Sequence, residues 1–193
     1  MQEKTITIPS VLIDRVIRGS AALNVLLVVG ASALIAISAQ VAIPLPFSPV
    51  PMTLQPLAVI LIGIALGSTR GAAAATLYLL EGLSGLPVFT QGHSGPAWLL
   101  GATAGYLYSY PVAAWVAGRL SERGWGSSIL RAIPAMLCAL GVIYLGGWSW
   151  LAALTSPETA FGLGVAPFVV ADIVKVVLGA TMVPYAQKLI SRV

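Results

Sequence analysis

Three long segments of this chain carry no formal charge, and they constrain its fold more than any other feature. The uncharged segments are residues 19–69, 82–118 and 132–157. A helix that crosses a bilayer needs about 20 consecutive apolar residues, and each of these segments is long enough for at least one crossing. The spacing of charge therefore predicts an integral membrane protein.

The composition supports this prediction and excludes several classes of soluble protein. Charged residues make up 8% of the 193 residues, hydrophobic residues make up 58%, and the mean hydropathy is +0.95. A soluble protein of this size needs far more surface charge, so a soluble enzyme, a disordered chain and a secreted disulfide-rich protein are excluded. Because the net charge of +4 comes without a run of basic residues, we assign it to loops facing the cytoplasm rather than to nucleic-acid binding.

The chain is expected to form a single domain, residues 1–193, with an all-α fold: a compact bundle of six transmembrane helices. The four prolines between Pro44 and Pro51 divide the first uncharged segment, because proline lacks a backbone N–H and clashes with the preceding helical turn. The predicted helices lie near residues 20–42, 53–68, 71–83, 97–118, 130–152 and 161–187.

The basic residues predict how such a bundle is oriented. If the N-terminus is cytoplasmic, six crossings place nine of the ten Lys and Arg residues on the cytoplasmic side and none outside, with Lys175 inside the last helix. Lys and Arg accumulate in cytoplasmic loops, so both termini are expected to be cytoplasmic. The nine residues are Lys4, Arg15, Arg18, Arg70, Arg119, Arg123, Arg131, Lys188 and Arg192.

The third predicted helix is short, and the segment after it, residues 82–98, is rich in glycine and proline. Irregular backbone is tolerated at membrane depth only where it is buried in protein or lines a cavity. The segment is therefore either one wall of a binding cavity or an ordinary external loop with many turn residues.

Asp172 and Lys175 are the most informative residues, because they lie midway along the otherwise apolar last helix. Charges at that depth cost a few kcal/mol, so they face the interior and either pair or bind a substrate. Their spacing of three residues places both on one helical face. The pair is therefore either a structural ion pair or a site for an anionic group at Lys175 and hydrogen-bond donors at Asp172.

Aromatic and amide side chains are candidates for completing such a pocket, although tyrosine and tryptophan also gather at membrane interfaces. No nucleotide-binding glycine motif and no catalytic Ser/His or Cys/His set is present, so no enzymatic activity is expected. The single histidine, His93, has no ligand partners nearby, and no metal site or cofactor is expected. The pocket candidates are Tyr78, Gln91, Trp98 and Tyr106, with Gln55, Tyr108 and His93 as further possibilities.

Three motifs in the same order resemble the BioY family, the biotin-binding S components of energy-coupling-factor (ECF) transporters. They are SPVPMTLQPLAVILIGIALGSTRGAAAATLYLLEGLSGLPVF, QGHSGPAWLLGATAGYLYSYPVAAWVAG and APFVVADIVKVVLGA. The resemblance implies a six-helix protein of the prokaryotic cytoplasmic membrane that captures biotin from outside. It also implies two partners, a transmembrane coupling subunit and cytoplasmic ATPase subunits.

The resemblance also assigns roles to residues. An acid and a lysine three residues later help hold the ligand in this family, and they match Asp172 and Lys175. Small residues on the first helix of S components commonly dock the coupling subunit, and Ser32, Ala36 and Ala39 offer such a face here without the literal A-x-x-x-A motif. Two alternatives remain: an S component for another vitamin, or a structural membrane subunit whose Asp–Lys pair only fixes helix packing.

Overall fold

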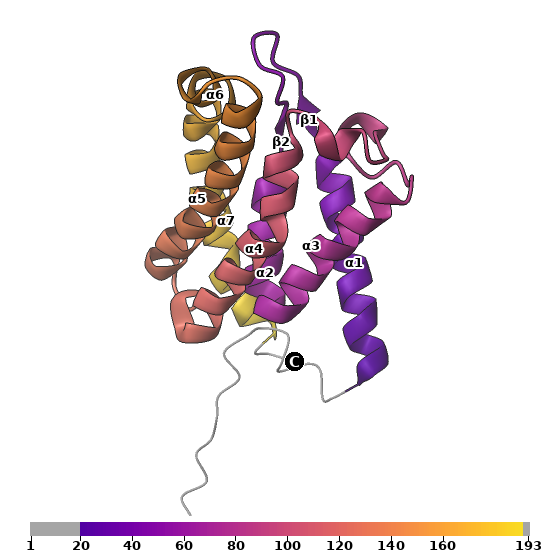
Figure 1. The fold of residues 1–193 in the computed structure, drawn as a ribbon. Coiled ribbons are helices and arrows are strands. Elements are labelled where there is room, and N and C mark those ends of the chain that lie inside the picture. Colours follow the sequence, from indigo (N-terminus) through magenta and orange to yellow (C-terminus); the bar gives the residue numbers. More distant parts are fainter. Residues whose placement is uncertain (1–19, 191–193) are drawn as a thin grey trace, which may run out of the picture.

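A computed structural model of the chain describes residues 20–190, which form a bundle of helices with a small β-hairpin at one end (Figure 1). The principal elements are α1 (Ala21–Gln40), β1 (Ala42–Ile43), β2 (Met52–Thr53), α2 (Gln55–Leu66), α3 (Ser68–Leu83), α4 (Ala104–Leu120), α5 (Ile129–Leu154), α6 (Pro157–Gly164) and α7 (Ala166–Ile190). Three short turns connect them: η2 (Thr90–Gly92), η3 (Trp98–Leu100) and η4 (Ser121–Trp125).

Helix α4 lies at the centre of the bundle and packs against α2, α3 and α5. The close approach depends on small residues: Gly63 of α2 lies against the backbone of Ala114, and Gly105 of α4 lies against Gly146 of α5. Small residues at helix interfaces allow backbones to come together, which increases packing contacts where the surrounding lipid gives no hydrophobic driving force. The helices at the centre of the bundle therefore pack with their backbones close together.

Three of the described helices have the length, and the exposed apolar side chains, that are expected of helices in a membrane protein. Helices α1, α5 and α7 are long and apolar enough to cross a bilayer. Leucine and valine side chains such as Leu26, Leu145 and Val170 are exposed on their outer faces, as expected where lipid is the solvent. Helices α2, α3 and α4 are shorter, with 12, 16 and 17 residues, so the count of six crossings stays a prediction.

Two predicted helix boundaries differ from the structure. The helix expected at 97–118 begins at Ala104, because the backbone of Gly101 is extended between the short turn η3 and α4. The helix expected at 161–187 is two helices, α6 and α7, separated at Val165. The carbonyl of Gly164 accepts a hydrogen bond from Tyr106 Oη at 2.6 Å, and Phe168 N–H bonds to Val165 instead, so the helical ladder is interrupted there.

The prolines predicted to divide the first uncharged segment form the tip of a β-hairpin. Ala42 pairs with Thr53 and Ile43 with Met52 in an antiparallel register. The hydroxyl of Ser48 in this tip donates to the carbonyl of Leu163 in α6 at 2.7 Å, so the hairpin is fastened across the bundle.

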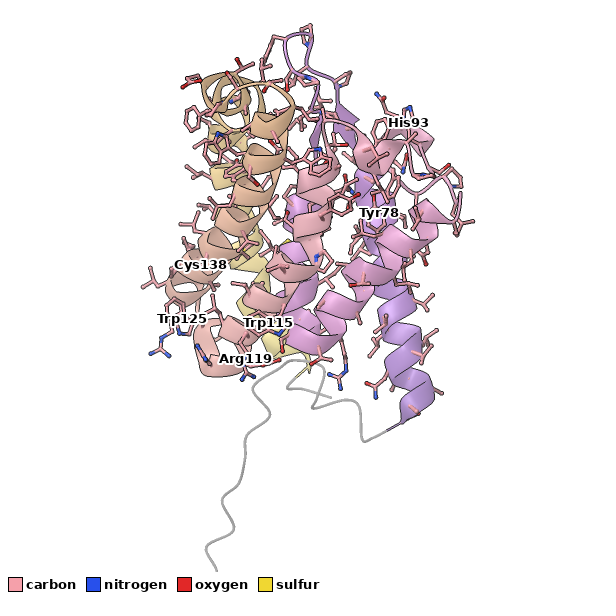
Figure 2. All side chains as sticks on the ribbon, viewed as in Figure 1. Tyr78, His93, Trp115, Arg119, Trp125 and Cys138 are labelled. Carbon is pink, nitrogen blue, oxygen red and sulfur yellow. The ribbon has the colours of Figure 1, made fainter. Side chains whose placement is uncertain are left out.

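The described basic residues of the predicted cytoplasmic set gather at one end of the bundle, which we call the basic end. The start of α1, the α2–α3 junction, the α4–α5 junction and the end of α7 all lie there (Figure 1). Arg70, Arg119, Arg123 and Arg131 belong to these junctions, and Figure 2 labels Arg119 among them. Of the remaining predicted cytoplasmic residues, Lys4, Arg15, Arg18 and Arg192 lie outside the described residues, as does the side chain of Lys188.

Candidate functional site

A cavity lies between the helices on the side of the molecule that carries the hairpin, away from the basic end. Its volume is about 50 Å³, which is room for a few water molecules. Its walls come from the hairpin, the start of α2, turns η2 and η3, and helices α4, α5 and α7. The lining residues are Val50, Pro51, Thr53, Gln55, Pro56, Thr90, Trp98, Thr103, Tyr106, Leu107, Tyr110, Ile143, Tyr144, Phe168, Asp172 and Lys175.

Asp172 and Lys175 form an ion pair in the wall of this cavity, as their spacing on one helical face predicts. Lys175 Nζ lies 2.8 Å from Asp172 Oδ1, and the two side chains are 16% and 6% exposed. Lys175 Nζ also donates to the carbonyl of Thr53 in β2 at 2.8 Å, and Tyr144 Oη donates to Asp172 Oδ2 at 2.7 Å. Each charge is thus paired and hydrogen-bonded, which offsets the cost of burying it.

The hydrogen-bonding capacity of this group is not exhausted by these contacts. A lysine ammonium has three N–H donors, and the contacts with Asp172 and Thr53 occupy two of them. An ionised carboxylate has about four acceptor positions, and Asp172 uses two in the contacts with Lys175 and Tyr144. The site can therefore receive an anionic group and a hydrogen-bond donor side by side.

A second polar group, centred on Gln55, forms another part of the wall. Gln55 is 2% exposed, and its Nε2 donates to Tyr78 Oη at 2.8 Å. Its Oε1 accepts from Thr90 Oγ1 at 3.2 Å. Tyr78 is fully buried on α3 (Figure 2) and supports Gln55 from behind without lining the cavity.

The 82–98 segment contributes to the cavity wall through two residues, Thr90 and Trp98. Phe89 anchors the segment, since it is fully buried and meets the ring of Tyr78 edge-on, with 5.5 Å between the ring centroids. Trp98 stacks on His93 with a centroid distance of 4.0 Å. Gln91 is exposed at a backbone φ of 59° and does not line the cavity, so its predicted place in the pocket is not observed.

Tyr106 lies in the cavity wall, as predicted, and its ring occupies space that glycines leave free. A Cβ at Gly147 would overlap the Tyr106 ring, and a Cβ at Gly164 would overlap its hydroxyl oxygen. The orientation of Tyr106 is thus fixed by packing from α5 and by its hydrogen bond to Gly164.

The residues proposed for docking a partner on α1 are mostly turned inward. Ser32 and Ala39 are fully buried, and the Ser32 hydroxyl donates to the Glu81 carboxylate of α3. Ala36 is half-buried against the core. The exposed side of α1 presents Val29, Ala33, Leu34 and Ile37, so Ser32 and Ala39 are not on the surface that a partner would reach in this structure.

Sequence reasoning missed Tyr144 and Thr53 and left Gln55 among the further possibilities. Tyr144 resembles an interfacial aromatic residue in the sequence, and Thr53 takes part through its backbone carbonyl, which no side-chain pattern reveals. Gln55 carried a signal, since it is an isolated amide next to an apolar run. Within residues 20–190, no group of three or more His, Cys, Asp or Glu residues is placed to hold a metal ion.

Comparison with known proteins gives consistent results. The sequence model of the BioY family matches residues 10–192. The chain is 40% identical over 157 residues to a probable biotin transporter BioY of Pyrococcus horikoshii, covering 81% of this chain and 90% of that protein. It is 36% identical over 159 residues to the biotin transporter BioY of Thermotoga maritima, covering 82% and 92%.

The fold is also similar to a crystal structure of the S-component for biotin from an ECF-type ABC transporter. The TM-score is 0.77 at 25% sequence identity, and the match covers 86% of this chain and 92% of the other. The order of the motifs, the bundle and the family match agree, and this chain belongs to the BioY family.

Proposed function

We propose that this chain is the biotin-binding S component of an ECF-type transporter, and that biotin binds in the cavity beside Asp172 and Lys175. The observation that carries the proposal is the ion pair with unused hydrogen-bonding capacity in the wall of an otherwise largely aromatic and apolar cavity. Relatives that bear the name biotin transporter, and a biotin S-component of the same fold, support it.

The chemistry of biotin fits this cavity. The valerate carboxylate matches the remaining N–H of Lys175, where a charge-assisted hydrogen bond is strong. The N–H groups of the ureido ring match the acceptor positions of Asp172. The fused rings require an apolar slot with aromatic walls, and Trp98, Tyr106 and Phe168 line the cavity. No cofactor takes part in the proposed function.

A cavity of about 50 Å³ is too small for a vitamin-sized ligand, so we infer that binding requires part of its wall to shift. The hairpin and the 82–98 segment contribute Val50, Pro51, Thr53, Thr90 and Trp98 to that wall. These connecting segments are easier to displace than packed helices. We therefore infer that biotin reaches the cavity by displacement of the hairpin and this loop.

The chain has no nucleotide-binding motif, so import requires an energy source from other subunits. We propose a transmembrane coupling subunit and cytoplasmic ATPase subunits as partners in a prokaryotic cytoplasmic membrane. The bundle would cross that membrane six times with both termini in the cytoplasm. The basic end then faces the cytoplasm, in agreement with the positive-inside rule, and the cavity opens toward the outside.

Isothermal titration calorimetry of the purified full chain with biotin tests the proposal. We expect saturable binding for the wild type and a loss of at least about 100-fold in affinity for Lys175→Ala, because the truncation removes the cation and leaves Asp172 buried with a lost partner. Arg119→Gln at the basic end is the matched control, with an expected change of less than about twofold.

Two results would contradict the proposal in different ways. Binding of another vitamin, without heat from biotin, would replace the substrate and retain the S-component assignment. If ligand binding is absent and replacement of both Asp172 and Lys175 by apolar residues leaves folding intact, the pair serves only helix packing.

A further inference from the structure

A second cavity lies at the basic end, where α4 turns into α5. Its volume is about 310 Å³, and it is lined by Arg123, Trp125, Leu130, Arg131 and Pro134. Gly124 adopts a φ of 86°, a conformation that glycine reaches without strain. It lies in the turn that places Arg123 and Trp125 alongside the first turn of α5. Figure 2 shows Trp125 and Arg119 at this end of the molecule.

The charge lining this cavity is unbalanced. Arg123 and Arg131 are exposed, and neither guanidinium group makes an ion pair or hydrogen bond with any residue between 20 and 190. The neighbouring acid, Glu122, is engaged elsewhere: Oε1 accepts from Ser68 and Oε2 pairs with Arg119 at 3.1 Å. Two guanidinium groups on one cavity repel each other unless an anion lies between them.

The start of α5 also favours an anion in this cavity. Its first turn contains no acidic residue and includes Arg131, and Ser128 at the N-cap makes no side-chain capping bond. The N-terminus of a helix carries partial positive charge and favours anions. The helix dipole and the two arginines therefore act in the same direction.

The surroundings indicate which anion fits. Of the lining residues, Leu130 is 84% exposed and Trp125 is partly exposed, and Leu137 further along α5 is partly exposed as well. These side chains continue onto the outer face of α5, which is long and apolar enough to cross a membrane. Tryptophan is enriched where hydrocarbon meets headgroups, and arginine binds phosphate through paired N–H donors.

We propose that this cavity binds the phosphate headgroup of an anionic phospholipid, with its acyl chains along the exposed face of α5. The phosphate lies between Arg123 and Arg131, and Trp125 packs at the level of the glycerol backbone. This site is independent of biotin binding, because it lies at the opposite end of the bundle.

Native mass spectrometry of the full chain with added lipids tests the proposal. We expect phosphatidylglycerol to be retained in preference to phosphatidylcholine. Arg123→Gln and Arg131→Gln should each weaken retention about fivefold, while Arg119→Gln, an equal change of charge at the same end, should have less than a twofold effect. Circular dichroism and thermal unfolding of each variant establish that it is folded.

Other outcomes overturn the proposal. Equal retention of phosphatidylcholine, or an equal effect of Arg119→Gln, would show only general attraction to the basic end. Displacement of the lipid by glycerol phosphate at similar concentration would assign the cavity to a soluble phosphate. Unchanged lipid retention combined with impaired assembly with ATPase subunits would assign the arginines to a protein interface.

Discussion

At the scale of single residues, Tyr144 adds a second hydrogen bond to the ion pair of the cavity. Its hydroxyl donates to Asp172 Oδ2 while Lys175 holds Oδ1, so the carboxylate is oriented from both sides. A hydrogen bond to a charged group contributes about 1.5–3 kcal/mol. We expect Tyr144→Phe to weaken biotin binding by about tenfold or more, measured by calorimetry.

Tyr108 provides the matched control for this variant. Its hydroxyl donates to the carbonyl of Leu99 at 2.6 Å, and the residue does not line the cavity. Tyr108→Phe should leave affinity within about twofold. Equal losses of affinity in the two variants would mean that removing either hydroxyl disturbs the fold and that Tyr144 does not act through Asp172.

The sequence was sufficient to predict that Asp172 and Lys175 lie together, because opposite charges three residues apart in an apolar helix are rare enough to be informative by themselves. Tyr144 could not be found in this way, since tyrosine is ordinary in a membrane helix and its role depends on a contact 28 positions along the chain. Ser32 and Ala39 were identified correctly as small residues on α1, but only the packing against α3 shows that they face inward.

At the scale of elements, the contact between α4 and α5 relies on the absence of a side chain at Gly105. A Cβ at this position would overlap the carbonyl oxygen of Gly146 and the Cβ of Trp150. Overpacking of this kind costs about 1–3 kcal/mol. We expect Gly105→Ala to lower the thermal unfolding midpoint in detergent by several degrees.

Gly141, also on α5, is the control for this substitution. A Cβ at Gly141 meets no atom within 4 Å, and alanine is favoured over glycine in a helix by about 1 kcal/mol. Gly141→Ala should therefore leave the midpoint unchanged or raise it. A decrease as large as that of Gly105→Ala would contradict the assigned contact.

Glu122 links the end of α4 to the start of α3 and makes the stability of this junction dependent on pH. Partial burial opposes its ionisation, but hydrogen bonds from Ser68 and Arg119 outweigh burial and hold the pKa of Glu122 below its ordinary value of 4.5. Its stabilisation is thus complete above pH 4.5 and is lost as the pH falls through the lowered pKa.

Thermal unfolding across the acidic range tests this linkage. Below pH 4.5 the wild type should lose stability more steeply than Glu122→Gln, which carries no titrating group at this position. Parallel curves for the two proteins would show that the junction does not depend on the charge of Glu122.

The helices themselves were predictable because hydropathy reports which segments enter the bilayer. Their ends were less so. The break between α6 and α7 arises from a hydrogen bond between Tyr106 and Gly164, residues that are far apart in the sequence. Proline spacing predicted an interruption before α2, but the strand pairing of Ala42 with Thr53 required knowledge of how the segment folds back.

At the scale of the whole molecule, the structure holds the cavity beside Asp172 and Lys175, and the sequence has no nucleotide-binding glycine motif. We expect proteoliposomes containing this chain alone to bind radiolabelled biotin without accumulating it, because no free energy source drives transport against a gradient. Uptake above the external concentration should appear only when the coupling and ATPase subunits are added. Accumulation by the chain alone would contradict the proposal that other subunits supply the energy for transport.

The contact between Lys175 and Thr53 joins helix α7 to the hairpin in the wall of the cavity. Helix α7 supplies the ammonium group and the hairpin supplies the carbonyl. The Lys175 side chain therefore both lines the cavity and binds the hairpin. A ligand oxygen that accepts the third N–H of Lys175 shares this ammonium group with Thr53. We therefore expect binding of a ligand at Lys175 to be coupled to the position of the hairpin through this one ammonium group.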